Sequence, residues 1–407
     1  MSSVFVPLQE PRPVQRGGFA LWQLGFRPFY LLAAGFAALS VPLWALQFSG
    51  VLQRAWLQGA AWHGHEMVFG YALAVIIGFL FTAGRNWSGQ PTPTGRPLMA
   101  LAALWLLARV LVLSPWPWAS LAANIAVPWL AAWALWRALH AAENRRNYFF
   151  VGLLAAMGAA TGMLHLHLMG RLPLPEALSN SLGMGLGLPL ALALDIVLFM
   201  IAVMAGRIVP MFSNNGVPGM QARRDPRVEK AALGSVLALL ALDALGLRGP
   251  LLAAALLVAL VAHLWRWLLW QPWKTLRNAL VWVLHAAYLW LPVHLGLRAA
   301  AELGWIAAGP ATHALTVGVI GMITLGMITR TALGHTGRPL RAGPFEQGAY
   351  LAMLGAALAR VLLPLLWPAG LMLAVQLSAA LWTLAFALYL WRYAPILVRP
   401  RADGQPG

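Results

Sequence analysis

Long apolar stretches recur along this chain and constrain its fold more than any other feature. A helix needs about 20 mostly apolar residues to cross a bilayer, and twelve stretches of about that length follow one another. They occupy residues 28–48, 62–84, 97–113, 116–140, 147–170, 182–206, 229–246, 249–270, 278–300, 311–333, 347–366 and 368–392. Only 10% of the 407 residues are charged, against roughly 25% in soluble domains. We therefore predict an all-α polytopic membrane protein with about twelve transmembrane helices.

The distribution of basic residues predicts how these helices are oriented. Lys and Arg outnumber Asp and Glu by 28 to 11, but they gather in alternate loops. The positive-inside rule therefore places both termini in the cytoplasm, which requires an even number of helices. We therefore interpret the surplus positive charge as a sign of how the helices are oriented in the lipid membrane. It does not indicate nucleic-acid binding. We expect one transmembrane domain at residues 21–395, with cytoplasmic tails at 1–20 and 396–407. The short stretches at 97–113 and 229–246 leave tilted or re-entrant helices open.

A pentapeptide repeat indicates internal duplication. Thr-Gly-Arg-Pro-Leu occurs at residues 94–98 and again at 336–340. Each copy follows a stretch with one histidine and two glycines at the same offsets, and each precedes Leu-Ala-Arg-Val-Leu. The matched residues are His65, Gly70, Gly78 and Arg109 in the first copy, and His313, Gly318, Gly326 and Arg360 in the second. The copies lie eight helices apart, and we hypothesise a threefold repeat of four-helix units.

Histidines concentrate near the outward ends of the predicted helices, where a buried imidazole needs a partner or a metal. His65 and His313 occupy equivalent positions in the repeat, and we interpret them as axial ligands of a b-type haem. The matched glycines either leave room for the macrocycle or permit close helix packing. Arg109 and Arg360 either pair with the haem propionates or extend to the outer lipid headgroups.

Cysteine is absent, which excludes disulfides, thiolate-bound iron–sulfur clusters and c-type haem attachment. Copper remains possible, because imidazole and thioether groups bind Cu(I) well. Residues four apart share a helix face, which pairs His63 with Met67, Met163 with His167, and His165 with Met169. His63 and His65 point to opposite sides of their helix and can serve different sites. The candidate metal ligands, for haem iron or copper together, are His63, His65, Met67, His165, His167 and His313.

Three further polar residues within the predicted helices have two interpretations each. His285 and Tyr288 lie one helical turn apart, either as a haem-site ligand and proton donor or as a hydrogen-bonded pair. Asp195, in the middle of its stretch, is either a proton-relay carboxylate or a structural one.

Four motifs resemble the NnrS family. They are Leu24–Tyr30 (LGFRPFY), Trp62–Met67 (WHGHEM), Arg207–Phe212 (RIVPMF) and the run from His313 to Leu340. The resemblance implies a twelve-span protein of the bacterial inner membrane with haem and copper as cofactors. It also implies that the protein handles nitric oxide or a related small molecule, in nitrosative-stress resistance or denitrification. It leaves the catalytic residues, and whether the chain is an enzyme at all, unassigned.

Two alternative functions remain open. A haem–copper oxidase or nitric oxide reductase-like enzyme agrees with twelve helices and with histidines on the second and tenth, although the chain lacks adjacent histidines. A secondary transporter agrees with repeats and isolated intramembrane charges, although transporter sites lie near the midplane and these polar residues lie toward the outer edge.

Overall fold

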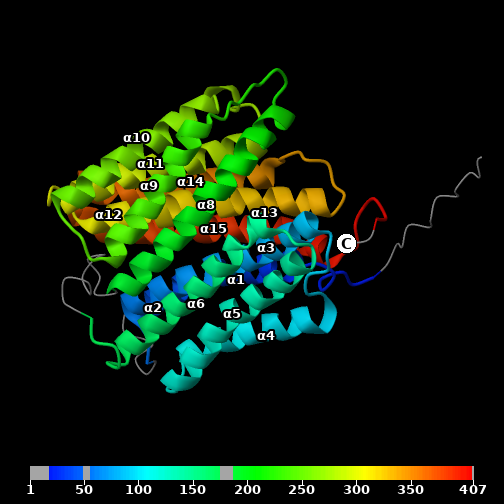
Figure 1. Ribbon diagram of the computed structural model, residues 1–407, viewed down its shortest axis with the longest axis horizontal. Coiled ribbons are helices and arrows are strands. Elements are labelled where there is room, and N and C mark those ends of the chain that lie inside the picture. The colour runs from blue at the N-terminus through cyan, green and yellow to red at the C-terminus, as the bar shows by residue number, and fades with distance from the viewer. Residues whose placement is uncertain (1–17, 49–55, 175–186, 406–407) are drawn as a thin grey trace, which may run out of the picture.

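The computed structural model describes residues 18–48, 56–174 and 187–405, and within these ranges it is helical and has no strand (Figure 1). The elements are α1 (Phe26–Phe48), α2 (Gly59–His65), η1 (Glu66–Ala72), α3 (Leu73–Ser88), α4 (Gly95–Val112), α5 (Pro117–Ala141), η2 (Arg145–Asn147), α6 (Phe149–Leu168), α8 (Gly187–Gly216), α9 (Pro226–Ala244), α10 (Pro250–Leu269), η3 (Pro272–Lys274), α11 (Ala279–Glu302), α12 (Ala308–His313), η4 (Ala314–Gly321), α13 (Met322–His335), α14 (Pro344–Leu366), η5 (Pro368–Gly370) and α15 (Leu371–Val398).

Each predicted apolar stretch corresponds to one helix or to one continuous run of helical segments, which confirms the all-α polytopic prediction. In the described residues, eleven runs are long and apolar enough to cross a membrane. The remaining predicted span corresponds to α9, which is not among these eleven and contains four charged residues. It still forms a regular helix, because Asp225 caps its N-terminus by accepting from two backbone N–H groups and Pro226 occupies the first turn.

Some predicted boundaries differ from the observed ones or lie outside the described residues. The stretch predicted at 182–206 begins outside them, and the predicted tail 1–20 is described only from residue 18. At the other end, α15 continues to Val398, past the predicted domain end at 395.

The two ends of the described chain meet at one end of the bundle. The Ala20 N–H donates to the Val398 carbonyl oxygen at 2.8 Å. The Arg27 guanidinium donates to the carbonyl oxygens of Leu397 at 2.9 Å and Arg399 at 2.8 Å. Figure 1 places the blue start of α1 beside the C-terminus. Ends that meet on one side of a membrane require an even number of crossings.

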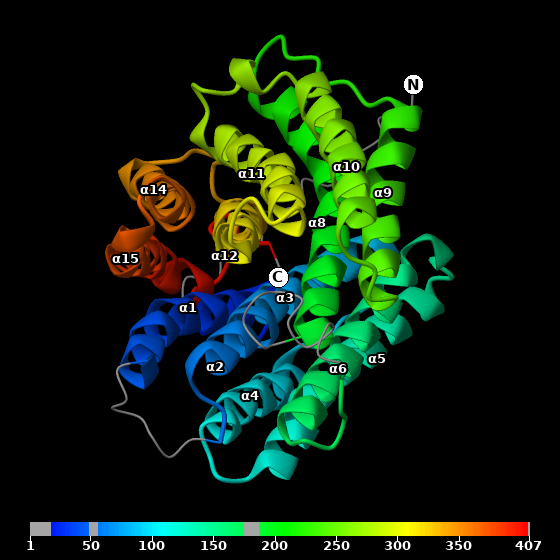
Figure 2. The same ribbon diagram turned by 90° about the vertical axis from the view of Figure 1, so that its left-hand side faces the viewer.

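Three runs form the interior of the bundle. They are the second, sixth and tenth in chain order, Gly59–Ser88, Gly187–Gly216 and Ala308–His335, with buried shares of 78%, 78% and 83%. The other eight candidate spans are 28–67% buried. Outer neighbours also repeat every four helices, since α1 packs on α15, α6 on α5 and α11 on α10. Figure 2 shows the resulting groups around the interior runs. This periodicity supports four-helix units repeated three times.

Candidate functional site

Two π-helical turns interrupt the interior runs at matched positions of the repeat. The turn η1 begins directly after His65, and η4 begins directly after His313. A π-turn inserts an extra residue into a helix, is rare, and is frequently found at functional sites. Because a π-turn follows each of the two matched histidines, we take the surroundings of His65 and His313 as the candidate site.

The first histidine of the repeat pairs with a histidine of α6. Nε2 of His65 lies 2.9 Å from Nε2 of His165, and both rings are fully buried. Nδ1 of His65 lies 3.0 Å from the Glu66 carboxylate, while Nδ1 of His165 has no hydrogen-bond partner among the described residues. The sequence predicts His313 as the partner of His65, whereas the structure places His165 of α6 within hydrogen-bonding distance of it.

Arg109 finds its counter-ion inside the protein. Its guanidinium donates to Glu66 Oε2 at 2.5 Å and also donates to the side-chain oxygen of Asn124. A buried charge requires a paired and hydrogen-bonded neighbour, and Glu66 at 0% exposure meets that need. The predicted contacts of Arg109 with a haem propionate or with lipid headgroups stay predictions. Glu66 carried a usable signal, because a carboxylate inside an apolar span calls for a cation.

The matched glycines accommodate neighbouring side chains. A Cβ on Gly70 would lie 2.7 Å from Glu66 Oε2 and 2.8 Å from Arg109 Nη1, and a Cβ on Gly318 would lie 2.5 Å from the Trp290 ring. The structure therefore supports the close-packing interpretation of these glycines. It leaves no space beside them for a macrocycle.

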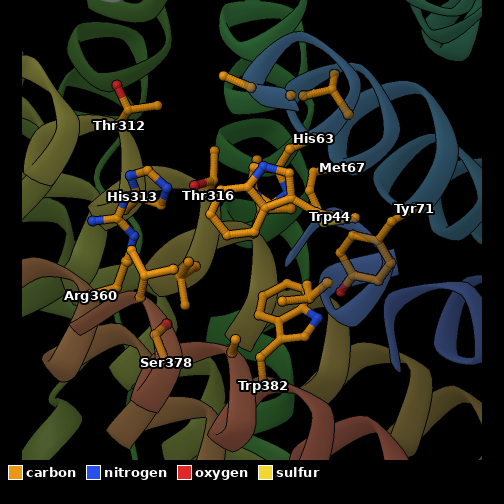
Figure 3. Close-up of a pocket in the computed structure, with 18 of the residues that line it drawn as sticks. Trp44, His63, Met67, Tyr71, Thr312, His313, Thr316, Arg360, Ser378 and Trp382 are labelled. Carbon is orange, nitrogen blue, oxygen red and sulfur yellow. The ribbon is translucent and has the colours of Figure 1, made fainter. Parts of the chain in front are cut away.

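His63 and His313 converge on a separate cavity of about 130 Å³. Residues two apart on a helix project to opposite sides, so His63 turns away from the His65–His165 pair. Met67, Arg360 and Trp44 line the same cavity. Figure 3 shows His63 and Met67 on one side of it and His313 with Arg360 on the other. The structure thus places His313 and His63 at the same cavity. The repeat had instead suggested His65 as the partner of His313, because those two histidines occupy equivalent positions.

The hydrogen bonding of His313 leaves one ring nitrogen for a ligand. Nδ1 donates to the Gly309 carbonyl oxygen at 2.8 Å, which makes Nε2 the nitrogen with a free lone pair. Metal-binding histidines characteristically donate their other nitrogen in this way. Across the cavity, His63 stacks on Trp44 with ring centroids 4.6 Å apart, and in the part of the chain that the structure describes its Nδ1 has no hydrogen-bond partner.

Arg360 differs from Arg109 despite their equivalence in sequence. It lines the cavity beside His313, and no carboxylate of the described residues lies within 4.0 Å of it. A positive charge at the wall of an otherwise apolar cavity favours an anionic ligand or an acidic substituent.

The remaining cavity wall was not anticipated from sequence. Tyr71 and Trp382 contribute aromatic surface. The Tyr71 hydroxyl bonds to the Thr324 hydroxyl, and Trp382 Nε1 donates to the Ala37 carbonyl oxygen at 3.0 Å. These bonds hold both rings in place. Tyr71 follows Met67 by four residues, and that spacing was the available signal.

The other predicted residues lie apart from this cavity. His285 bonds to Ser213 at 2.8 Å, whereas the Tyr288 hydroxyl lies 2.7 Å from His263 Nδ1 and 3.0 Å from Arg266 Nη1. The interpretation of His285 and Tyr288 as a hydrogen-bonded pair is therefore wrong, while their role as ligand and proton donor stays a prediction. The reason is that α11 packs between α8 and α10, and each side chain finds a partner on a different neighbour.

His167 also stands alone among the predicted copper ligands. Its Nδ1 donates to the Leu172 carbonyl oxygen at 3.1 Å, which secures the turn after α6. In the described part of the chain no three His, Cys, Asp or Glu residues gather closely enough to hold a metal ion. A metal at either histidine pair would therefore need thioether or exogenous ligands in addition.

Comparison with known proteins assigns the chain to a family. No curated protein matches it. The family described as NnrS protein matches residues 20–401, which includes both histidine pairs, both π-turns and all the helices described above. The match spans nearly the whole sequence, so this chain belongs to the NnrS family.

Proposed function

We propose that the cavity between α2 and α12 binds copper through His63, His313 and Met67, and that this centre binds nitric oxide or a related small molecule. Family membership makes the chain a membrane protein of the nitric oxide response in general. The observation that carries the finer proposal is the convergence of His63 and His313 on one buried cavity.

The donor set agrees with copper. Two imidazoles and a thioether are the mixture that Cu(I) prefers, and His313 already holds the tautomer that a ligand needs. Bound copper would supply a redox-active centre with an open position for a small ligand. Arg360 would stabilise negative charge on that ligand, and the aromatic rings of Trp44 and Trp382 would exclude water.

Haem is a second candidate at the same residues. The two imidazoles can ligate haem iron, and Arg360 offers a cation for a propionate. A cavity of about 130 Å³ holds an ion with a small ligand, whereas drug-sized ligands occupy roughly 300–1,000 Å³. A macrocycle would therefore require the side chain of Trp44 or Trp382 to move, and for this reason we favour copper.

Metal analysis and visible spectra of purified protein test this proposal. Protein expressed with sufficient copper and haem is analysed for both metals and recorded as a reduced-minus-oxidised spectrum. We expect copper to be lost in His63→Ala and in His313→Ala and retained in His167→Ala, the matched control from outside the cavity. Copper retained in both cavity variants, or absent from the unmodified protein, would refute the copper site. A Soret band lost in the same two variants would assign haem to this pair.

A further inference from the structure

The second copy of the repeated pentapeptide contributes to a basic hollow at the end of the bundle where the two chain ends meet. Arg338 of that copy lines a cavity of about 300 Å³ together with Arg392 and Arg399. The three guanidinium groups come from the α13–α14 loop, from α15 and from the residue directly after α15. They are separated in sequence and brought together by the fold. We call this feature the arginine hollow.

Carboxylates of the described residues neutralise only part of the arginine hollow, since one carboxylate faces three guanidinium groups. Glu346 is the nearest, at 3.7 Å from Arg392 Nε. Its oxygens already accept from the Gly343 N–H at 2.7 Å and from the Tyr393 hydroxyl at 2.7 Å. The neighbouring acid, Asp403, is paired with Arg401 at 2.5 Å. The hollow therefore keeps an excess of positive charge.

The electrostatic surroundings of Arg338 reflect this excess. Partial burial, followed by the positive charges of Arg392 and Arg399, lowers the pKa of Arg338 below its usual range. A bound anion would remove that repulsion. Guanidinium groups match phosphate oxygens with paired hydrogen bonds, so a phosphate group suits the hollow.

The rim of the hollow is apolar, which distinguishes a lipid from a free ion. Trp391 is 76% exposed and Phe345 is 41% exposed, and both line the hollow. Exposed aromatic residues beside arginines at a bundle end are typical of the membrane interface. Basic pockets between helices on the cytoplasmic side bind the headgroups of anionic lipids. We propose that the arginine hollow binds the phosphate of an anionic phospholipid, with Trp391 and Phe345 against its acyl chains.

The first copy of the pentapeptide provides a matched control. Arg96 occupies the position that corresponds to Arg338. It is exposed and lies outside the arginine hollow. Replacing either arginine removes one positive charge from the same motif, so only the surroundings differ.

Native mass spectrometry of delipidated protein tests the proposal. Phosphatidylglycerol, phosphatidylcholine and inorganic phosphate are added separately to the wild type and to the Arg338→Gln, Arg392→Gln, Arg399→Gln and Arg96→Gln variants. We expect saturable binding of phosphatidylglycerol over phosphatidylcholine, weakened about fivefold by each hollow variant and unchanged by Arg96→Gln.

Three results would overturn the proposal. Equal binding of the two lipids by the wild type would do so without any variant, which keeps the test valid if a variant fails to fold. Equal weakening by Arg96→Gln would indicate general surface charge. Inorganic phosphate binding with no preference for the anionic lipid would assign the hollow to a small anion.

Discussion

At the residue scale, Glu66 determines the protonation of the histidine pair beside it. A carboxylate that pairs with a guanidinium accepts hydrogen bonds, and Glu66 pairs with Arg109 in this way. Nδ1 of His65 must therefore carry a proton, which makes its Nε2 an acceptor. His165 then donates from Nε2, and its unpartnered Nδ1 is deprotonated. The Glu66 carboxylate thus determines which nitrogen is protonated in His65 and, through His65, in His165.

The Glu66–Arg109 pair should be important for stability. Glu66→Leu leaves a buried guanidinium uncompensated, which costs roughly 3–5 kcal/mol in comparable buried pairs. We expect the thermal unfolding temperature of the purified protein in detergent to fall clearly in this variant. The control is Glu66→Leu combined with Arg109→Leu, which removes both charges and should recover most of the loss. Equal unfolding temperatures for Glu66→Leu and the wild type would contradict this account.

At the element scale, the π-turns separate what sequence can predict from what it cannot. Apolar length alone predicts helices at residues 62–84 and 311–333, and the structure has helical runs there at Gly59–Ser88 and Ala308–His335. Nothing in the composition of residues 66–72 distinguishes a π-turn from an α-helix. The partner of His65 was also unpredictable, since it depends on how α6 docks. The separation of His63 from His65 followed from helical geometry, and it holds in the structure.

Gly318 of η4 should tolerate no side chain. In Gly318→Ala the new Cβ would lie 2.5 Å from Cγ of Trp290, and such overpacking costs roughly 1–3 kcal/mol. Gly35→Ala in α1 is the control, because nothing lies within 4 Å of a Cβ there, and alanine favours a helix by about 1 kcal/mol over glycine. Thermal unfolding in detergent should therefore shift in opposite directions in the two variants. Shifts of the same sign would show that packing at η4 does not govern the outcome.

At the scale of the whole molecule, the number of crossings depends on α9. The two ends of the described chain meet at one end of the bundle, which favours an even number of crossings, and α9 is the helix that would supply the twelfth. Its 19 residues span about 28 Å as an α-helix, close to the thickness of the hydrocarbon core. Its acidic residues are neutralised from neighbouring helices, Glu229 by Arg266 at 2.6 Å and Asp243 by Arg298 at 2.5 Å. These ion pairs explain how a charged helix lies within the bilayer.

Thiol labelling on either side of α9 tests this crossing. The chain has no cysteine, so Gln221→Cys before α9 and Leu247→Cys after it each introduce a single exposed thiol. A membrane-impermeant maleimide is applied to cells in which the membrane that holds the protein is intact and its outer face is accessible to the reagent. It should modify the Leu247→Cys variant. The Gln221→Cys variant should react only after the membrane is disrupted, because the positive-inside rule places its loop in the cytoplasm. Reaction of both variants from one side would make α9 re-entrant, and reversed sidedness would invert the predicted orientation of the whole bundle.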